Sequence, residues 1–227
     1  MTYTELVAKI RNYTEVGSEV LTSTIVDGFI RDAEFKIFRE ADADYAREYA
    51  TSSFTANNKY LALPNSSGSS GTNTDRRALI VRSVVVTNAS NIQISLEPRD
   101  DTFITEYNSS GDTGIPKYYA TFRENAIEVA PTPSAAFVVE LDYIYTPDGL
   151  SPTNTETYIS VNAPELLLYA CLVEAFAYLK GPMDMYKLYQ EKYNSALQGF
   201  TLEQTGRRRR DEFQDGTLRI KVPSPSP

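Results

Sequence analysis

The stretch that most constrains the fold is residues 162–182, "NAPELLLYACLVEAFAYLKGP", because it reads as a helix that is apolar on almost every side. Asn162 is the expected N-cap, and Glu165 follows it at capping-box spacing. Gly181 is the expected left-handed cap and Pro182 the stop. A helix without a polar face must be surrounded by other elements, so the sequence predicts that this helix lies at the centre of a helical core.

Helical periodicity also predicts the elements that surround this helix. Residues 4–13 and 22–45 place apolar side chains at helical spacing, and a further helix begins at about Asp184 after a two-residue break. The side chains of that last helix expected to face inward are Met185, Leu188, Tyr189, Tyr193, Ala196, Leu197 and Phe200. Together the two ends of the chain predict four helices in one bundle.

Between these helices the period changes to that of strands. Residues 78–87, "ALIVRSVVVT", are strongly β-branched, and residues 91–97, "NIQISLE", alternate cleanly, with "NAS" between them as a hairpin turn. Three more strands are expected in "PKYYATF", "NAIEVA" and "FVVELDYIY". The predicted fold class is therefore α+β: a four-helix bundle core with an inserted antiparallel β domain and an extended C-terminal arm. The predicted divisions are residues 1–50, 51–150, 151–205 and 206–227.

The arm, "GRRRRDEFQDGTLRIKVPSPSP", combines a basic run with a lone strand pattern. Leu218, Ile220 and Val222 alternate with polar residues, which is the period of a half-buried strand, yet no hairpin partner adjoins them. The arm has a net charge of +3, whereas the whole chain has −8 and the remainder therefore −11. The four arginines 207–210 suit a solvated extension of the last helix, DNA phosphates, or charge-assisted pairs with acids of a partner protein. The lone strand beside them favours the partner protein.

The residue types needed for catalysis or metal binding are scarce. The chain has no histidine, which removes Ser-His-Asp and Cys-His arrangements and most zinc chemistry. Its one cysteine, Cys171, stands among leucines and is expected in the core. The acid pairs Asp42/Asp44 and Asp100/Asp101 come with no supporting motif. We therefore predict no enzyme, no catalytic residue, no cofactor and no metal.

Neither a membrane span nor a secretion signal is expected. No apolar run approaches the roughly 20 residues that cross a bilayer, and the opening residues lack the features of a signal peptide. The sixteen tyrosines suit either a core or a protein interface.

The order of several segments resembles a known family. These are "GIPKYYATFRENAIEVAPTPSAAFVVELDYIYTPDGLS", then "NAPELLLYACLVEAFAYLKGPMDMYKLYQEKYNSAL" and "GRRRRDEF", with "ELVAKIRNYTEV" and "FIRDAEFKIFRE" near the start. They resemble the head-to-tail adaptor (connector or neck) proteins of tailed bacteriophages.

The resemblance implies a structural virion protein of the neck, assembled in the cytoplasm of the bacterial host. It implies a homo-oligomeric ring, usually of twelve subunits, beneath the portal protein. The ring would extend the DNA channel without sequence-specific binding, and it would provide the platform for tail, nozzle or tail-terminator proteins. The C-terminal arm would dock on the portal, which gives a role to Arg207, Arg208, Arg209, Arg210, Leu218, Ile220 and Val222.

Two other functions remain open at this point. A virion-associated cell-wall hydrolase would use two carboxylates, and a host-surface glycan-binding module would be formed by residues 52–148. The structural adaptor is the hypothesis that the residues and the resemblance favour together.

Overall fold

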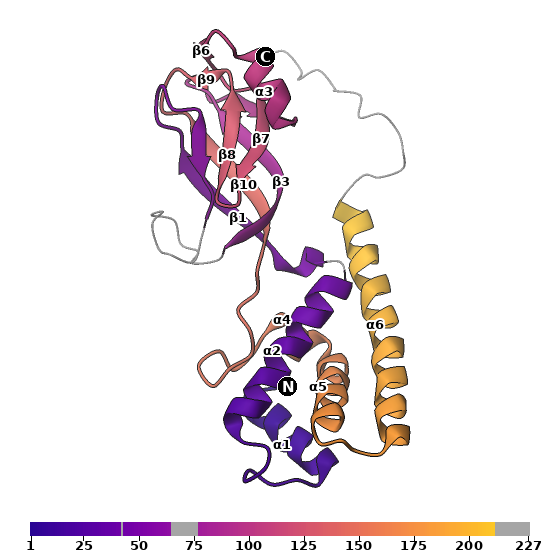
Figure 1. Ribbon diagram of the computed structural model, residues 1–227. Coiled ribbons are helices and arrows are strands. Elements are labelled where there is room, and N and C mark those ends of the chain that lie inside the picture. Colours follow the sequence, from indigo (N-terminus) through magenta and orange to yellow (C-terminus); the bar gives the residue numbers. More distant parts are fainter. Residues whose placement is uncertain (42, 65–76, 212–227) are drawn as a thin grey trace. The chain divides into compact units, whose positions relative to one another are not determined.

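The chain divides into two compact units (Figure 1). A computed structural model describes residues 1–41, 43–64 and 77–211. The first unit, which we call the helical unit, contains Met1–Asp44 and the chain from Gly149 onward. The second, the β unit, is Tyr45–Asp148 and contains every described strand. None of the helices within the described ranges is both long and apolar enough to cross a membrane.

One helix organises the helical unit. Its helices are α1 (Tyr3–Thr14), α2 (Ser23–Glu40), α4 (Tyr158–Asn162), α5 (Pro164–Tyr178) and α6 (Met183–Asp211). Nine of the 15 residues of α5 are buried, and α1, α2, α4 and α6 all pack against it. The prediction that the apolar helix is central is correct.

The predicted four-helix bundle core is wrong. The described chain has six α-helices and ten strands in three sheets, and the main helix contacts of the helical unit all involve α5. In a bundle each helix contributes one inward stripe to a shared core. Here α5 is apolar all round, so it needs a neighbour on every side, and the neighbours pack on it more than on one another.

The two ends of α5 also differ from the prediction. Asn162 closes α4, and Ala163 occupies the N-cap position of α5 instead. At the other end Lys180, with φ 51°, takes the left-handed conformation expected of Gly181. The N–H of Gly181 donates to the Phe176 carbonyl at 2.9 Å, which completes a Schellman-type cap. Glycine is needed there because a Cβ would lie 2.7 Å from Phe176 Cδ1.

The β unit contains two four-stranded sheets and one two-stranded sheet. Its strands are β1 (Arg47–Ser53), β2 (Tyr60–Ala62), β3 (Ala78–Thr87), β4 (Gln93–Ser95), β5 (Glu97–Pro98), β6 (Thr113–Gly114), β7 (Tyr118–Arg123), β8 (Ala126–Ala130), β9 (Thr132–Pro133) and β10 (Val138–Tyr145). The sheets have the orders β1-β10-β3-β4, β2-β8-β7-β5 and β6-β9. Most pairs are antiparallel, but β5–β7 and β6–β9 are parallel, which the sequence did not predict.

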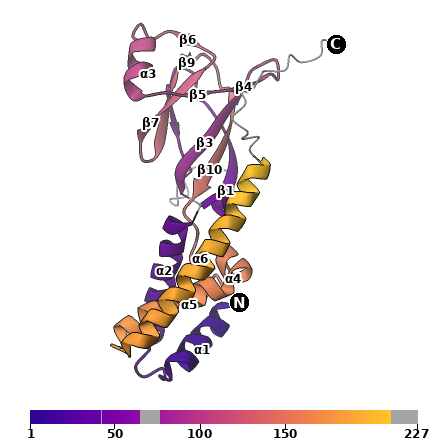
Figure 2. The same cartoon turned by 90° about the vertical axis from the view of Figure 1, so that its right-hand side faces the viewer.

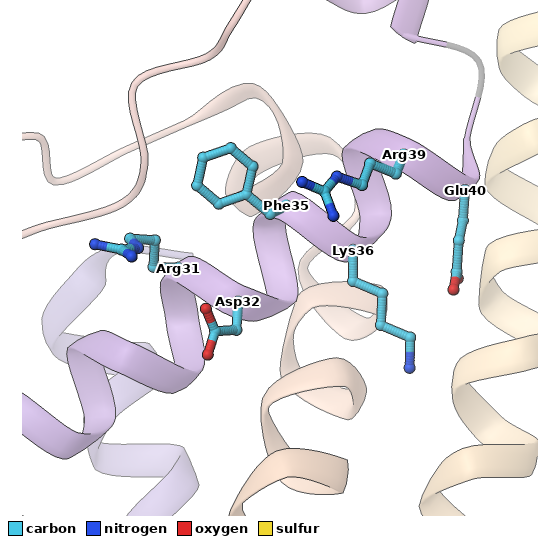
Figure 3. A pocket seen from close by; sticks show the side chains of 6 residues that line it. All are labelled: Arg31, Asp32, Phe35, Lys36, Arg39 and Glu40. Atoms are coloured by element: carbon cyan, nitrogen blue, oxygen red, sulfur yellow. The ribbon is translucent and has the colours of Figure 1, made fainter.

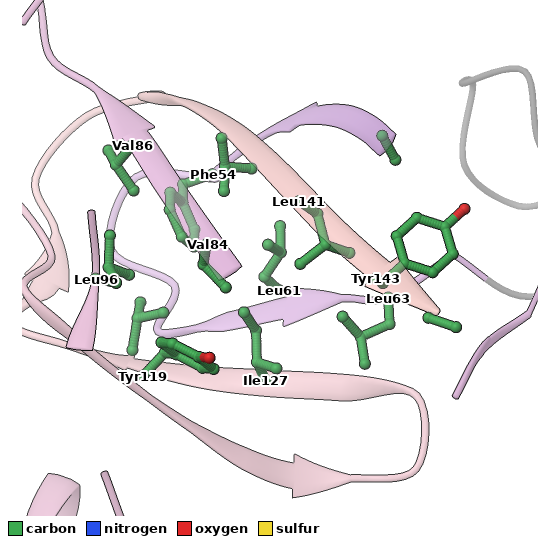
Figure 4. Packing of buried hydrophobic residues seen from close by; sticks show 14 of the residues in the cluster. Phe54, Leu61, Leu63, Val84, Val86, Leu96, Tyr119, Ile127, Leu141 and Tyr143 are labelled. Carbon is green, nitrogen blue, oxygen red and sulfur yellow. The ribbon is translucent and has the colours of Figure 1, made fainter. Parts of the chain in front are cut away.

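The core of the β unit lies between the two larger sheets (Figure 4). Leu141, Val84 and Val86 project from the first sheet, and Ile127 and Tyr119 from the second. The expected hairpin joins β3 to β4: the N–H of Asn88 donates to the Ile92 carbonyl at 3.0 Å.

A short helix covers the other face of the second sheet. In α3 (Asp101–Tyr107), Ile104 packs with Ala120 and Ala130, which alternate along their strands with the residues of the inter-sheet core. This short helix therefore forms a second, smaller cluster with the second sheet.

Candidate assembly interface

The basic run predicted as a contact site continues a helix. Arg207, Arg208, Arg209 and Arg210 belong to the last turns of α6, which ends at Asp211. Residues 206–211 are thus helical, whereas the sequence predicted an extended arm from residue 206. Leu218, Ile220 and Val222 lie outside the described residues, so their predicted role in docking stays a prediction.

The helix that carries the arginines is about twice as long as its support. With a rise of about 1.5 Å per residue, the 29 residues of α6 span about 43 Å and the 15 of α5 about 22 Å. After the short turn between them, α6 runs back along α5 and continues beyond its first residue (Figure 1 and Figure 2). The basic run therefore occupies the projecting end of the longest helix.

Polar contacts hold α6 to its neighbours. The hydroxyl of Tyr193, which is 1% exposed, donates to Glu40 Oε2 of α2, and the ammonium of Lys36 lies 4.6 Å from the centre of its ring. Burial raises the pKa of Tyr193, and the hydrogen bond to Glu40 raises it further. Further along, the buried Gln204 donates from Nε2 to the Tyr158 hydroxyl of α4 at 3.3 Å. The direction of α6 is therefore fixed by contacts at two points along its length, Tyr193 and Gln204.

Of the seven side chains of α6 predicted to face inward, three are buried, three are half-buried and one is exposed. Tyr189, Tyr193 and Phe200 are buried, whereas Leu188 is 40% exposed. Gln204 continues the buried stripe four residues after Phe200. Its burial could not be predicted from the sequence, because a polar residue near a basic run is normally expected in solvent.

An aromatic cluster joins α1, α5 and α6. The ring of Tyr189 stacks on Phe176 at 5.2 Å and lies 6.3 Å from Tyr13 and 6.4 Å from Tyr169, all between ring centres. Lys192 Nζ lies 5.5 Å from the Tyr169 ring centre. These tyrosines mainly support packing between helices, although Tyr13 keeps 48% exposure.

A buried carboxylate attaches the returning chain to α2. Glu34 is 9% exposed; its Oε2 accepts from the Leu150 N–H at 2.7 Å, and its Oε1 accepts from the Thr157 hydroxyl at 2.8 Å. Thr157 in turn caps α4. Burial raises the pKa of Glu34, and the two hydrogen bonds oppose the rise. The group is thus structural, and neither its spacing nor its helical context identified it in the sequence.

The profile of the SU10 adaptor protein family matches residues 1–220, which include the whole β unit and every described helix of the helical unit. The chain belongs to the SU10 adaptor protein family. No curated protein matches it. The resemblance to phage head-to-tail adaptors is confirmed at this level: the protein is a structural adaptor of a phage particle that interacts with other head or tail proteins.

The cysteine and the acid pairs of this adaptor, which are the residues that could suggest catalysis, lie at positions that fit structural roles. Cys171 is fully buried, and burial raises the pKa of its thiol well above the ordinary value. Asp100 occupies the N-cap position of α3, and Asp101 its first turn. Asp42 lies outside the described residues. Within the described ranges no three His, Cys, Asp or Glu side chains are grouped as metal ligands.

The outer surface of α2 is hollowed (Figure 3). The hollow is open and is lined by Arg31, Asp32, Phe35, Lys36, Arg39 and Glu40. Phe35 is 40% exposed there. This surface has no signature in the sequence, because the periodicity of α2 indicates only its buried face.

Proposed function

We propose that this adaptor forms a ring of twelve identical subunits beneath the portal of the phage head. The ring extends the DNA channel and provides the platform for tail, nozzle or tail-terminator proteins. The observation that carries the proposal is the family match over residues 1–220. The subunit would act in the neck of the virion after assembly in the host cytoplasm.

The C-terminal segment is proposed to dock on the portal. The helix that leads to it is held in place, because Tyr193 attaches α6 to α2 about four turns before the basic run and Gln204 attaches it to α4 about one turn before. Arg207–Arg210 would pair with acids of the portal. Leu218, Ile220 and Val222 would supply alternate side chains for strand addition to a portal sheet edge.

The charge balance supports the role of DNA in this proposal. Residues outside the C-terminal 22 carry a net charge of −11, so most of the surface repels phosphates. A channel wall of that character lets duplex DNA pass without sequence-specific binding.

Electron microscopy and mass measurement of the full chain, with and without portal protein, test the proposal. We expect rings of twelve on the portal, and an adaptor that stays monomeric and ignores the portal would refute it. A chain truncated after Asp211 should keep its fold and lose most of its portal affinity.

Reversal of Arg207–Arg210 to glutamate should weaken docking in a salt-dependent way, since exposed charge pairs are screened over about 8–10 Å. The matched control reverses Lys9 of α1 and three other exposed cations outside α2 and α6.

A further inference from the structure

Two helices of the helical unit keep a complete outer face that their own subunit does not use. On α2, Val26, Ile30, Ala33 and Ile37 face the core, and on α6 Tyr189, Tyr193, Phe200 and Gln204 do so. In Figure 1 α5 lies between α2 and α6, and both pack on it. Their outer faces therefore point in different directions, and one copy cannot bring them together.

The outer face of α2 is basic and apolar. Gly28, Asp32, Phe35 and Arg39 follow one another at steps of four, three and four residues, which place them in one row opposite the buried residues; Arg31 lies beside them. All five are exposed. Neither arginine forms an ion pair with any described residue. Phe35 lies between the two arginines in Figure 3.

The outer face of α6 is acidic and apolar. It has the same steps of four and three residues and consists of Asp184, Leu188, Glu191, Ser195, Gln198 and Leu202. Leu202 is 74% exposed and Leu188 40%. This row contains two carboxylates and no cation. Lys187 and Lys192 flank it, and Lys192 lies over the rings of Tyr169 and Tyr189.

Glycines in these faces have no explanation inside the subunit. A Cβ on Gly28 in α2, or on Gly199 beside the α6 row, would meet nothing within 4 Å. Glycine in the interior of a helix costs about 0.5–1 kcal/mol relative to alanine. Close approach of a helix from another molecule would explain why glycine stands at these two positions. Gly181 differs from them, because atoms of its own subunit already lie close to it.

We infer that the α2 row of one subunit packs against the α6 row of the next. Charge complementarity identifies a second copy of the chain as the partner of the α2 row. Two arginines and one aspartate on α2 would face two carboxylates on α6, and Phe35, Leu188 and Leu202 would lie between them. Two different faces joined from copy to copy make a heterologous contact, which closes into a ring when the rotation permits. The inference rests on the proposed ring and names its contact.

Paired charge reversals in the full chain test the contact. The α2 variant carries Arg31→Glu and Arg39→Glu, and the α6 variant carries Asp184→Lys and Glu191→Lys. One helix pair is a small interface, so self-association is measured by sedimentation up to the highest soluble concentration, and on the portal by microscopy. We expect each variant alone to associate at least tenfold more weakly than the natural chain, and an equimolar mixture of the two to recover most of the loss.

Two further variants separate the contact from folding and from net charge. Lys9→Glu with Lys117→Glu makes the same change of net charge as the α2 variant, but on other exposed surfaces, and should leave association unchanged. Gly28→Gln should strengthen helix α2 yet weaken association several-fold, because the longer side chain keeps the partner helix away. A merely structural role of Gly28 predicts no loss of association.

The outcomes distinguish this inference from the ring itself. If the natural chain forms rings and the α2 and α6 variants do so equally well, the contact is refuted and the ring stands. If only the α2 variant loses association, or if the mixture recovers nothing, α2 meets something other than α6 and the inference fails. If the natural chain never self-associates, alone or on the portal, the ring and its contact fail together.

Discussion

The two units differ in how their cores are distributed. In the helical unit one helix, α5, supplies nine buried residues, and the other helices pack on it. In the β unit the buried cluster draws residues from both four-stranded sheets and the segments between them. A core concentrated in one helix leaves its neighbours free on their outer faces, whereas two facing sheets bury the apolar residues of their inner faces on each other. The free surface of the helical unit therefore lies on whole helix faces, whereas the β unit exposes single apolar side chains such as Leu79, Ile80 and Ile92.

The largest expected effect tests whether the core of the helical unit depends mainly on the single helix α5. Leu167→Ala in α5, at 0% exposure, should lower the free energy of unfolding of the helical unit by about 3–5 kcal/mol. Leu61→Ala in strand β2 of the β unit, at 7% exposure, should cost its unit about 2 kcal/mol. Amide hydrogen exchange measured separately over α5 and over β3 and β10 reports the two units. Equal losses would contradict the comparison.

A second test concerns the buried charge of the β unit. Glu128 is 2% exposed, and its Oε1 lies 2.5 Å from Nζ of Lys59, whose side chain is 41% exposed. Removal of one partner of a buried pair costs about 3–5 kcal/mol, and the exposure of Lys59 reduces this to about 2 kcal/mol for Lys59→Ala. Chemical unfolding measures the loss. The double variant Lys59→Met with Glu128→Leu should recover most of it, and no recovery would mean that packing rather than charge is responsible.

A matched pair of glycine substitutions contrasts a crowded position with an open one. Gly181→Ala should destabilise the helical unit by about 1–2 kcal/mol, because its Cβ would lie 2.7 Å from Phe176 Cδ1. Gly28→Ala should stabilise the same unit by about 0.5–1 kcal/mol, since nothing lies within 4 Å of its Cβ. Thermal unfolding of the monomer measures both. Changes of the same sign would remove the distinction between the two glycines.

The smallest expected effect is a change in how steeply the free energy of unfolding varies with pH. The pKa of Glu34 is raised in the folded state by burial. Its contribution to stability is therefore present below the unfolded pKa and is lost as pH rises through the folded pKa. Glu34→Gln should remove this decline between acidic and neutral pH, which unfolding titrations of the two chains would show. Parallel curves would mean that Glu34 does not ionise with a raised pKa.

Locally encoded features could be predicted from the sequence. The central position of α5 follows from its apolar composition, and the β3–β4 hairpin follows from two β-branched runs around a turn. The caps of α5 were wrong by one residue at each end, because a capping residue is chosen by the packing around it: Gly181 avoids the Phe176 ring, and Lys180 takes the left-handed conformation.

The candidate interface also has one part that is visible in the sequence and another part that only the structure reveals. Arg207–Arg210 are conspicuous in the sequence, and the structure shows only that they continue a helix. The exposed rows of α2 and α6 went unnoticed, because an exposed phenylalanine or leucine has no signature until the buried face of its helix is known.

The sequence by itself determined the long helices α1, α2, α5 and α6 and the strands β3, β4, β7, β8 and β10, and that the α5 helix must be enclosed, because these properties depend on neighbours a few residues away. Strand β1 and helix α4 were not predicted. Only the tertiary structure decided that the helices gather on α5 rather than form a bundle, that Glu34 holds Leu150 and Thr157, and that α3 covers the second sheet. Those outcomes depend on contacts between residues far apart in the chain, and many arrangements of the same elements satisfy the local pattern equally well.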